Sequence, residues 1–236
     1  MQRENMKFFA IAIVTAFGLL LATVPLANAQ NAFQCTGTIA DGRTIDSNLV
    51  VPANKSCELD NVRVAGNVHV GTGATLNALP GSGQTVTIGG NIVADHCGGV
   101  ELNSQGGTIS VEGNVTIRNC MTPNSYFFGG LVVQGNLRVD SNNSETGGYF
   151  FAGLVVQGNL SVDNNNAGPG NKTLILQSNQ VSGNVDLSDN SAGVPPFVDG
   201  NKISGNLLCS GNSPPPVGAS NTVGGREQGQ CAALPP

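Results

Sequence analysis

The 236-residue sequence predicts an all-β fold of stacked coils, a parallel β-helix, and three observations support this prediction. A Gly-Asn pair recurs seven times, at intervals of 22 to 25 residues. Around each pair, branched aliphatic residues alternate with polar residues, which is typical of short, half-buried strands. The six cysteines fall into three pairs that are separated by about the same interval. We therefore expect roughly nine coils of about 23 residues.

The composition excludes several other classes of protein. The chain has 33 Gly, no Trp and only 11% charged residues, and it is poor in the residues that favour long helices. Its 39% of hydrophobic residues are too regularly spaced for a disordered chain. The pI is about 4.8 and no run of Lys or Arg is present, so we expect no nucleic-acid partner.

Residues 1–29 have the three parts of a secretory signal peptide: a basic start with Arg3 and Lys7, an apolar run, and Ala27-Asn28-Ala29 at the end. The alternative is a retained membrane anchor, but the apolar run is short for a bilayer span. We expect cleavage after Ala29, a secreted protein (extracellular or periplasmic), and no membrane association after cleavage. Residues 30–236 are then one β-helix domain, in which we expect an N-terminal coil over 30–60, regular coils over 61–212 and a C-terminal cap over 213–236.

Alignment of the repeats on their glycines reveals three aliphatic columns. Two residues before the glycine lie Val64, Ile88, Val111, Val133, Val156, Val181 and Ile203. Two residues after it lie Val68, Ile92, Val115, Leu137, Leu160, Val185 and Leu207. Four residues after it lie Val70, Ala94, Ile117, Val139, Val162, Leu187 and Cys209. A unit this short cannot bury its apolar face alone, so its copies must stack with equivalent residues above one another.

Two other repeat architectures fit less well. The frame V-x-G-N-V-x-V differs from that of a leucine-rich repeat, and left-handed β-helices use six-residue units. The chain resembles the right-handed parallel β-helix proteins of the pectin-lyase-like superfamily. It also resembles Gly- and Asn-rich exported bacterial β-helix proteins of unassigned activity, in segments such as Gly66-Asn67-Val68-His69-Val70 and Gly73-Ala74-Thr75-Leu76. The resemblance covers residues 30–236 and implies the fold, but it implies no particular activity.

Asparagines and glycines are expected to shape the corners of the coil. Seven residues after the glycine, one column holds Asn142, Asn165, Asn190 and Asn212, which predicts a ladder of amide hydrogen bonds along the stack. The glycine of each Gly-Asn pair is expected to turn one strand into the next with a positive φ. We interpret the asparagines as corner residues rather than as ligands.

The cysteines test the stacking independently. Six cysteines allow 15 pairings, and the repeat favours one of them: Cys35 with Cys57, Cys97 with Cys120, and Cys209 with Cys231. Equivalent positions on adjacent coils lie about 4.8 Å apart, within the Cα range of a disulfide. An exported protein also lies in an oxidising compartment.

The sequence offers little evidence of metal or cofactor chemistry. Its two histidines are His69, at an outward position, and His96, which adjoins Cys97. A His/Cys zinc site at His96 is conceivable, but the expected disulfide uses the same cysteines. No metalloprotease, nucleophile-elbow, Walker or dinucleotide motif occurs. We expect no metal and no cofactor.

One charged column provides the candidate catalytic residues. Five residues after the glycine lie Asp95, Arg118, Asp140 and Asp163. The candidates are Asp140 and Asp163, as stacked carboxylates near the spacing used by retaining glycosidases, together with Arg118. Because the signs alternate along most of the column, a solvated row of surface salt bridges is the preferred interpretation.

The segments that begin at Tyr126 and Tyr149 both read Tyr-Phe-Phe, and they are expected to stack on adjacent coils. One Phe of each is expected to point into the core. The remaining aromatic residues are either further core packing or an exposed platform for sugar rings.

These observations favour an exported, noncatalytic protein with a structural or surface-interaction role, with an extracellular glycan or a cell-surface component as the partner. The alternative is a polysaccharide lyase or glycoside hydrolase that uses surface carboxylates. End-to-end assembly is a third hypothesis, but bridged and capped ends favour a monomer.

Overall fold

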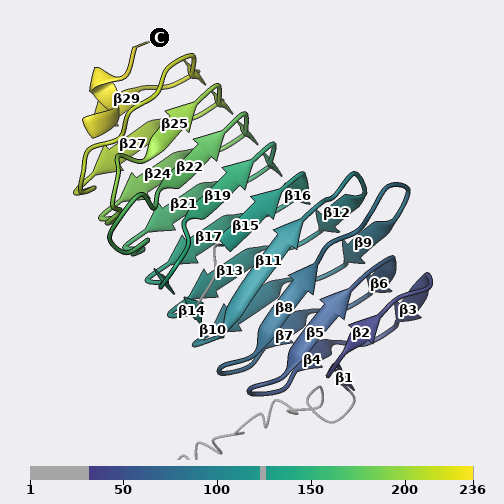
Figure 1. Cartoon of the computed structure of the whole chain (residues 1–236). Coiled ribbons are helices and arrows are strands. Elements are labelled where there is room, and N and C mark those ends of the chain that lie inside the picture. Colours follow the sequence, from purple (N-terminus) through teal and green to yellow (C-terminus); the bar gives the residue numbers. More distant parts are fainter. Residues whose placement is uncertain (1–31, 123–125, 236) are drawn as a thin grey trace, which may run out of the picture. The chain divides into compact units, whose positions relative to one another are not determined.

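The computed structural model describes residues 32–122 and 126–235, which form a right-handed parallel β-solenoid (Figure 1). The chain divides into Met1–Gln30 and Asn31–Pro236. The predicted signal peptide, residues 1–29, lies outside the described residues and stays a prediction. No helix found between residues 32 and 235, apart from the gap at 123–125, is long and apolar enough to cross a membrane.

Three parallel sheets run along the solenoid. Sheet A has ten strands: β1 (Phe33–Gln34), β4 (Leu49–Val51), β7 (Val68–Val70), β10 (Ile92–Asp95), β13 (Val115–Arg118), β17 (Leu137–Asp140), β21 (Leu160–Asp163), β24 (Val185–Ser188), β27 (Leu207–Ser210) and β29 (Glu227–Gly229). Sheet B has eight: β2 (Thr38–Ile39), β5 (Ser56–Leu59), β8 (Thr75–Ala78), β11 (Gly99–Asn103), β15 (Tyr126–Gly129), β19 (Tyr149–Ala152), β22 (Leu174–Gln177) and β25 (Phe197–Asp199). Sheet C has nine: β3 (Arg43–Ile45), β6 (Val62–Val64), β9 (Thr85–Ile88), β12 (Thr108–Val111), β16 (Leu131–Val133), β20 (Val155–Val156), β23 (Gln180–Val181), β26 (Lys202–Ile203) and β28 (Thr222–Val223).

Each turn of the chain visits sheets A, B and C in that order. Eight turns carry a strand in every sheet, and a further turn carries strands in sheets A and C only. A short pair, β14 (Met121–Thr122) with β18 (Asn143–Ser144), lies after sheet A. The first turns are shorter than the later ones, since Phe33 pairs with Leu49 whereas Val68 pairs with Ile92. The predicted fold class is confirmed.

The core of the solenoid consists of the predicted aliphatic columns. All residues of the three columns have side chains that are at most 2% exposed. The polar residues between them face outward, because successive side chains of a strand point to opposite faces. Tyr126 stacks on Tyr149 and Phe128 stacks on Phe151 inside the core, with ring centroids 4.9 and 5.0 Å apart.

The predicted amide ladder is confirmed, and we call Asn142, Asn165, Asn190 and Asn212 the inner Asn ladder. The main-chain N–H and the Nδ2 of Asn142 both donate to Oδ1 of Asn165, each at a distance of 3.0 Å. The same Nδ2 also donates to the carbonyl oxygen of Ile117, at 3.1 Å. All four side chains are buried, and the ladder ends at Gln230, whose Oε1 accepts from Asn212.

A second buried ladder, which was not predicted from the sequence, lies between sheets B and C. Asn179 donates to Oδ1 of Asn201, and Asn201 donates to Oδ1 of Asn221, each from the main-chain nitrogen and from Nδ2. Asn179 and Asn201 each lie four residues before the glycine of a Gly-Asn pair, but on the preceding turns this position is aliphatic, as at Leu131 and Leu154, so the column does not stand out as a row of asparagines.

The expectation that the Gly-Asn glycines adopt a positive φ is wrong. None of these glycines has a positive φ; the left-handed residues lie six positions later, for example His96 and Asn119. The glycines are required by close packing instead. A Cβ on Gly135 would lie 2.6 Å from Oδ1 of Asn114 and 2.8 Å from the carbonyl oxygen of Gly113 on the preceding turn.

The predicted cysteine pairing is confirmed. The Cα–Cα distances are 5.5, 4.4 and 5.2 Å for Cys35–Cys57, Cys97–Cys120 and Cys209–Cys231. Cys97–Cys120 occupies the column of the inner Asn ladder, and the N–H of Cys97 donates to Sγ of Cys120 at 3.1 Å. The main-chain N–H of Cys120 in turn donates to Oδ1 of Asn142, so the disulfide continues the ladder by two turns.

The assumption that every disulfide joins equivalent positions needs correction. Cys209 is in register with Gly229, and Cys231 lies two residues further on. Cys57 lies in sheet B, whereas Cys35 directly follows a strand of sheet A. The two outer disulfides therefore run diagonally near the ends, and only the central one is vertical.

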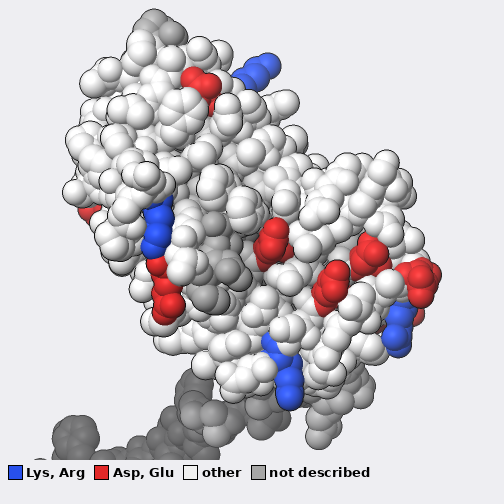
Figure 2. Space-filling model, viewed as in Figure 1, with Lys and Arg blue, Asp and Glu red and all other residues white. Residues whose placement is uncertain are grey.

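The last turn covers the end of the core. Strands β28 and β29 extend sheets C and A, and the 3₁₀ helix η1 (Gln230–Ala233) places Cys231 and Leu234 against the core. Charged side chains are sparse on the visible face of the solenoid, as expected for a chain with 11% charged residues (Figure 2).

Candidate functional site

A shallow groove lies on the outer face of sheet A. Its floor is a row of outward side chains from four adjacent strands, which are in register: Val93, Thr116, Arg138 and Ser161. The depression has a volume of about 520 Å³ and is open to solvent along its length. It follows the solenoid axis, because residues in register lie above one another.

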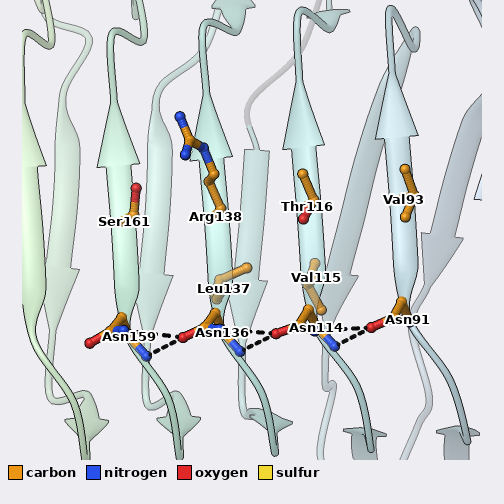
Figure 3. A pocket seen from close by; sticks show the side chains of 10 residues that line it. All are labelled: Asn91, Val93, Asn114, Val115, Thr116, Asn136, Leu137, Arg138, Asn159 and Ser161. Carbon is orange, nitrogen blue, oxygen red and sulfur yellow. Dashed lines mark hydrogen bonds between the residues drawn. The ribbon is translucent and has the colours of Figure 1, made fainter. Parts of the chain in front are cut away.

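One wall of the groove is made by the asparagines of the Gly-Asn pairs, of which Asn91, Asn114, Asn136 and Asn159 line it (Figure 3). The row begins at Asn48, whose Oδ1 accepts from Asn67, and we call the full series the outer Asn ladder: Asn48, Asn67, Asn91, Asn114, Asn136, Asn159, Asn184 and Asn206. Oδ1 of Asn114 accepts the main-chain N–H of Asn136 at 2.8 Å and its Nδ2 at 3.1 Å, and the other steps repeat this geometry.

The outer Asn ladder presents donors at regular intervals. Each amide Nδ2 carries two hydrogens, and the ladder bond uses one of them. No other acceptor for the Asn114 or Asn136 Nδ2 lies within the described part of the chain, so the second hydrogen is left for water or a ligand. Asn114 and Asn136 are exposed. The wall therefore offers one amide donor per turn, about 4.8 Å apart.

The predicted charged column borders the floor of the groove on the side away from the asparagines. Asp95, Arg118, Asp140 and Asp163 are in register, as expected. Arg118 donates to Asp95 at 3.0 Å, whereas Asp140 accepts from Arg138 of its own strand at 2.9 Å. The column is thus divided between two separate ion pairs, and Asp163 belongs to neither.

The environments of the carboxylates differ. An amide hydrogen bond from Asn119 lowers the pKa of Asp95, with Arg118 adding to the effect. Both oxygens of Asp140 are engaged, one by Arg138 and the other by the Ser141 hydroxyl at 3.0 Å. An ordinary surface salt bridge of this kind contributes little to stability.

Asp163 is the least compensated of the candidate residues. The Ser161 hydroxyl donates to its Oδ2, but no group in the described part of the chain donates to its Oδ1, which is buried. Burial raises the pKa of Asp163, and the negative charges of Asp186 and Asp140 add to this shift. A half-buried carboxyl group with a raised pKa beside a second carboxylate can act as a general acid.

The histidines lie outside this groove. His69 and His96 are exposed, and His96 pairs with Asp95 through Nδ1 at 2.9 Å. Cys97 and Cys120 form a disulfide and are not metal ligands. Within residues 32–122 and 126–235, no three His, Cys, Asp or Glu side chains form a cluster that could hold a metal ion. The expectation of no metal and no cofactor stays a prediction.

The outward aromatic pair lies on sheet B rather than beside the groove. Phe127 and Phe150 stack with ring centroids 4.7 Å apart and an interplanar angle of 9°. Because they stack on each other, each ring covers one face of the other. This arrangement does not favour the sugar platform considered from the sequence, since such platforms present ring faces.

The asparagine wall was not predicted from the sequence. The interpretation of these asparagines as corner residues left it out, although a polar residue repeated at every turn also indicates a continuous row on the surface. Comparison of the chain with family models, with curated proteins and with solved structures gives no significant match.

Proposed function

We propose that this chain is an exported, noncatalytic protein that binds an extended glycan in the groove of sheet A. The outer Asn ladder carries the proposal, because it offers one amide donor per turn along a solvent-open groove. Thr116, Ser161 and Arg138 add hydroxyl and guanidinium groups. Neutral hydrogen-bond donors and acceptors in a row suit the hydroxyls of a polysaccharide.

Three disulfides support an oxidising compartment outside the cytosol. Together with the signal peptide expected at residues 1–29, they support secretion. We further propose that the solenoid is related to the right-handed pectin-lyase-like proteins. That relationship is consistent with the coil length and the three-sheet cross-section, and it carries no assignment of activity.

The binding proposal is tested by filling the groove. Thr116→Trp places a large ring on the floor, and we expect it to weaken binding to any glycan found by array screening by about tenfold or more. Thr87→Trp is the matched control, because Thr87 is also outward and partly exposed but lies on sheet C. Equal binding by the two variants would contradict the assignment to sheet A.

A second candidate function, glycoside hydrolysis or polysaccharide cleavage, is favoured by one observation. Asp163 has a raised pKa and its row neighbour Asp140 is ion-paired, which gives two carboxyl groups in different environments. Turnover assays on neutral and acidic polysaccharides distinguish the hypotheses. Activity in the wild-type protein that is lost in both Asp163→Asn and Asp140→Asn would establish an enzyme, whereas binding without turnover supports our proposal.

A further inference from the structure

A row of apolar side chains runs along the outer face of sheet B, on the C-terminal half of the solenoid. Its five members occupy equivalent positions on successive turns: Phe127, Phe150, Ile175, Phe197 and Val217. We call these residues the sheet B row. Every other outward column of the described sheets contains polar residues within any such run of turns.

The sheet B row is accessible. Phe127 and Phe197 are each 36% exposed and Val217 is 47% exposed. Gly129 and Ala152 lie in the neighbouring outward row beside the two stacked Phe rings, so these two rings stand out as a ridge, whereas the same neighbouring row continues with Gln177 and Asp199. In Figure 2 the surface over β15, β19 and β22 carries little charge, with coloured side chains mainly at its margins. Phe150 and Ile175, between these exposed members, are half-buried. An apolar surface patch of this kind is typical of interaction sites.

The same row changes character toward the N-terminus. Its preceding positions are Glu101, Asn77 and Glu58, and acidic side chains gather over this half of the face (Figure 2). Burial raises the pKa of Glu101, which means that its carboxylate is poorly solvated. A cation placed beside Glu101 would compensate this charge. The surface thus has an apolar part and an acidic end in one straight line.

The geometry of the row limits the shape of its partner. Each strand contributes only one outward apolar residue, so the apolar surface extends along the solenoid axis rather than along the strands. Four steps of about 4.8 Å span about 19 Å. An α-helix covers this length in about 13 residues, with one turn per 5.4 Å. An extended peptide fits less well, because side chains on one of its faces repeat every 6 to 7 Å or so.

We propose that the sheet B row binds an amphipathic α-helix of a partner protein, about four turns long, with Lys or Arg in its first turn beside Glu101. The helix lies along the solenoid axis with its apolar stripe on the row. Its N-terminus points toward Glu101, because the positive end of the helix dipole then faces the carboxylate. This site is on a different sheet from the glycan groove and does not depend on it.

The experiment uses a designed, fluorescently labelled 18-residue helical peptide with Leu at i, i+3, i+4, i+7 and i+11 and two Lys in the first turn. Fluorescence anisotropy measures its Kd for the disulfide-intact protein. We expect Phe127→Ser/Phe150→Ser to weaken binding at least tenfold, and Glu101→Gln to weaken it about threefold and to reduce its salt dependence. A peptide with the two Lys moved to its last turn should bind more weakly.

Val132→Ser/Val155→Ser is the matched control, since these two outward valines are stacked neighbours on sheet C. It should leave peptide binding unchanged, as should Thr116→Trp in the groove of sheet A. The proposal is overturned if the peptide does not bind at millimolar concentration, or if a scrambled peptide binds equally well. It is also overturned if sedimentation shows a dimer that only Phe127→Ser/Phe150→Ser dissociates, because a second copy would then occupy the row.

Discussion

Two rows of asparagine amides border sheet A, and they use the same hydrogen bonds in different surroundings. The inner Asn ladder is buried, and each Nδ2 that it contains also donates to a main-chain carbonyl oxygen. The outer Asn ladder is open to water and leaves donors unused. The role of an asparagine in this fold therefore depends on its column. In the buried column it satisfies main-chain groups of the core, and in the exposed column it offers hydrogen-bond donors for binding.

The largest test of this comparison removes one rung from each ladder. Asn165→Ala leaves the N–H and Nδ2 of buried Asn142 without their acceptor, and the carbonyl oxygen of Val139 without its donor. We expect a loss of about 3 kcal/mol or more in the free energy of unfolding. Asn136→Ala should cost less than about 1 kcal/mol, because water replaces the lost bonds. Urea unfolding measures both, and equal losses would contradict the distinction.

The Cys97–Cys120 disulfide occupies the column of the inner Asn ladder, so it can be replaced by two asparagines. Cys97→Ala/Cys120→Ala should lower the free energy of unfolding by about 3 kcal/mol, since it opens a loop of 23 residues and removes two rungs. Cys97→Asn/Cys120→Asn should recover part of this loss by extending the amide ladder. A double Asn variant no more stable than the double Ala variant would show that the amides cannot replace the disulfide here.

The packing of the outer ladder is tested at its glycine. Gly135→Ala brings a Cβ to within 2.6 Å of Oδ1 of Asn114, so we expect a loss of about 2 kcal/mol and a shifted amide signal for Asn136 in NMR spectra. Gly153 is the control for substitution itself, since it has a positive φ of 63° but no atom within 4 Å of a Cβ. Gly153→Ala should cost only the backbone strain and leave the outer ladder unchanged.

The smallest effect is expected at Asp163, whose strand β21 runs between the two ladders. Both ladders are uncharged, whereas burial raises the pKa of Asp163 in the folded protein above its ordinary value of 3.8. Ionisation of Asp163 therefore destabilises the folded protein. The free energy of unfolding that depends on Asp163 is highest below about pH 4, where the carboxyl group is protonated, and it falls as the pH rises through the raised pKa. Asp163→Asn should be more stable than the wild type at pH 7, by less than about 1 kcal/mol because the site is half open to water, and should lose this advantage near pH 3. Thermal melts at the two pH values measure the difference.

The sequence predicted much of this architecture because stacking in a solenoid is one-dimensional. Residues one repeat apart become neighbours, so the buried columns, the vertical Cys97–Cys120 bridge and the inner Asn ladder followed from spacing alone. The pairing of Arg138 with Asp140, and of Arg118 with Asp95, did not follow, because long side chains choose between partners on their own strand and on adjacent turns. The groove wall was missed for another reason: the asparagines of the Gly-Asn pairs directly precede an inward column, so alternation places them outward, but a role as corner residues accounts for the same pattern without a binding surface.

The hydrogen bonds of the two ladders also have directions. In the outer Asn ladder each Nδ2 points to the preceding turn, as Asn136 does to Asn114, whereas in the inner Asn ladder it points to the following turn, as Asn142 does to Asn165. Main-chain N–H donors to each Oδ1 fix these orientations. The amide dipoles of the two rows are therefore antiparallel and oppose each other on the turns that carry both, so lengthening the solenoid by such turns adds little electric field at its ends.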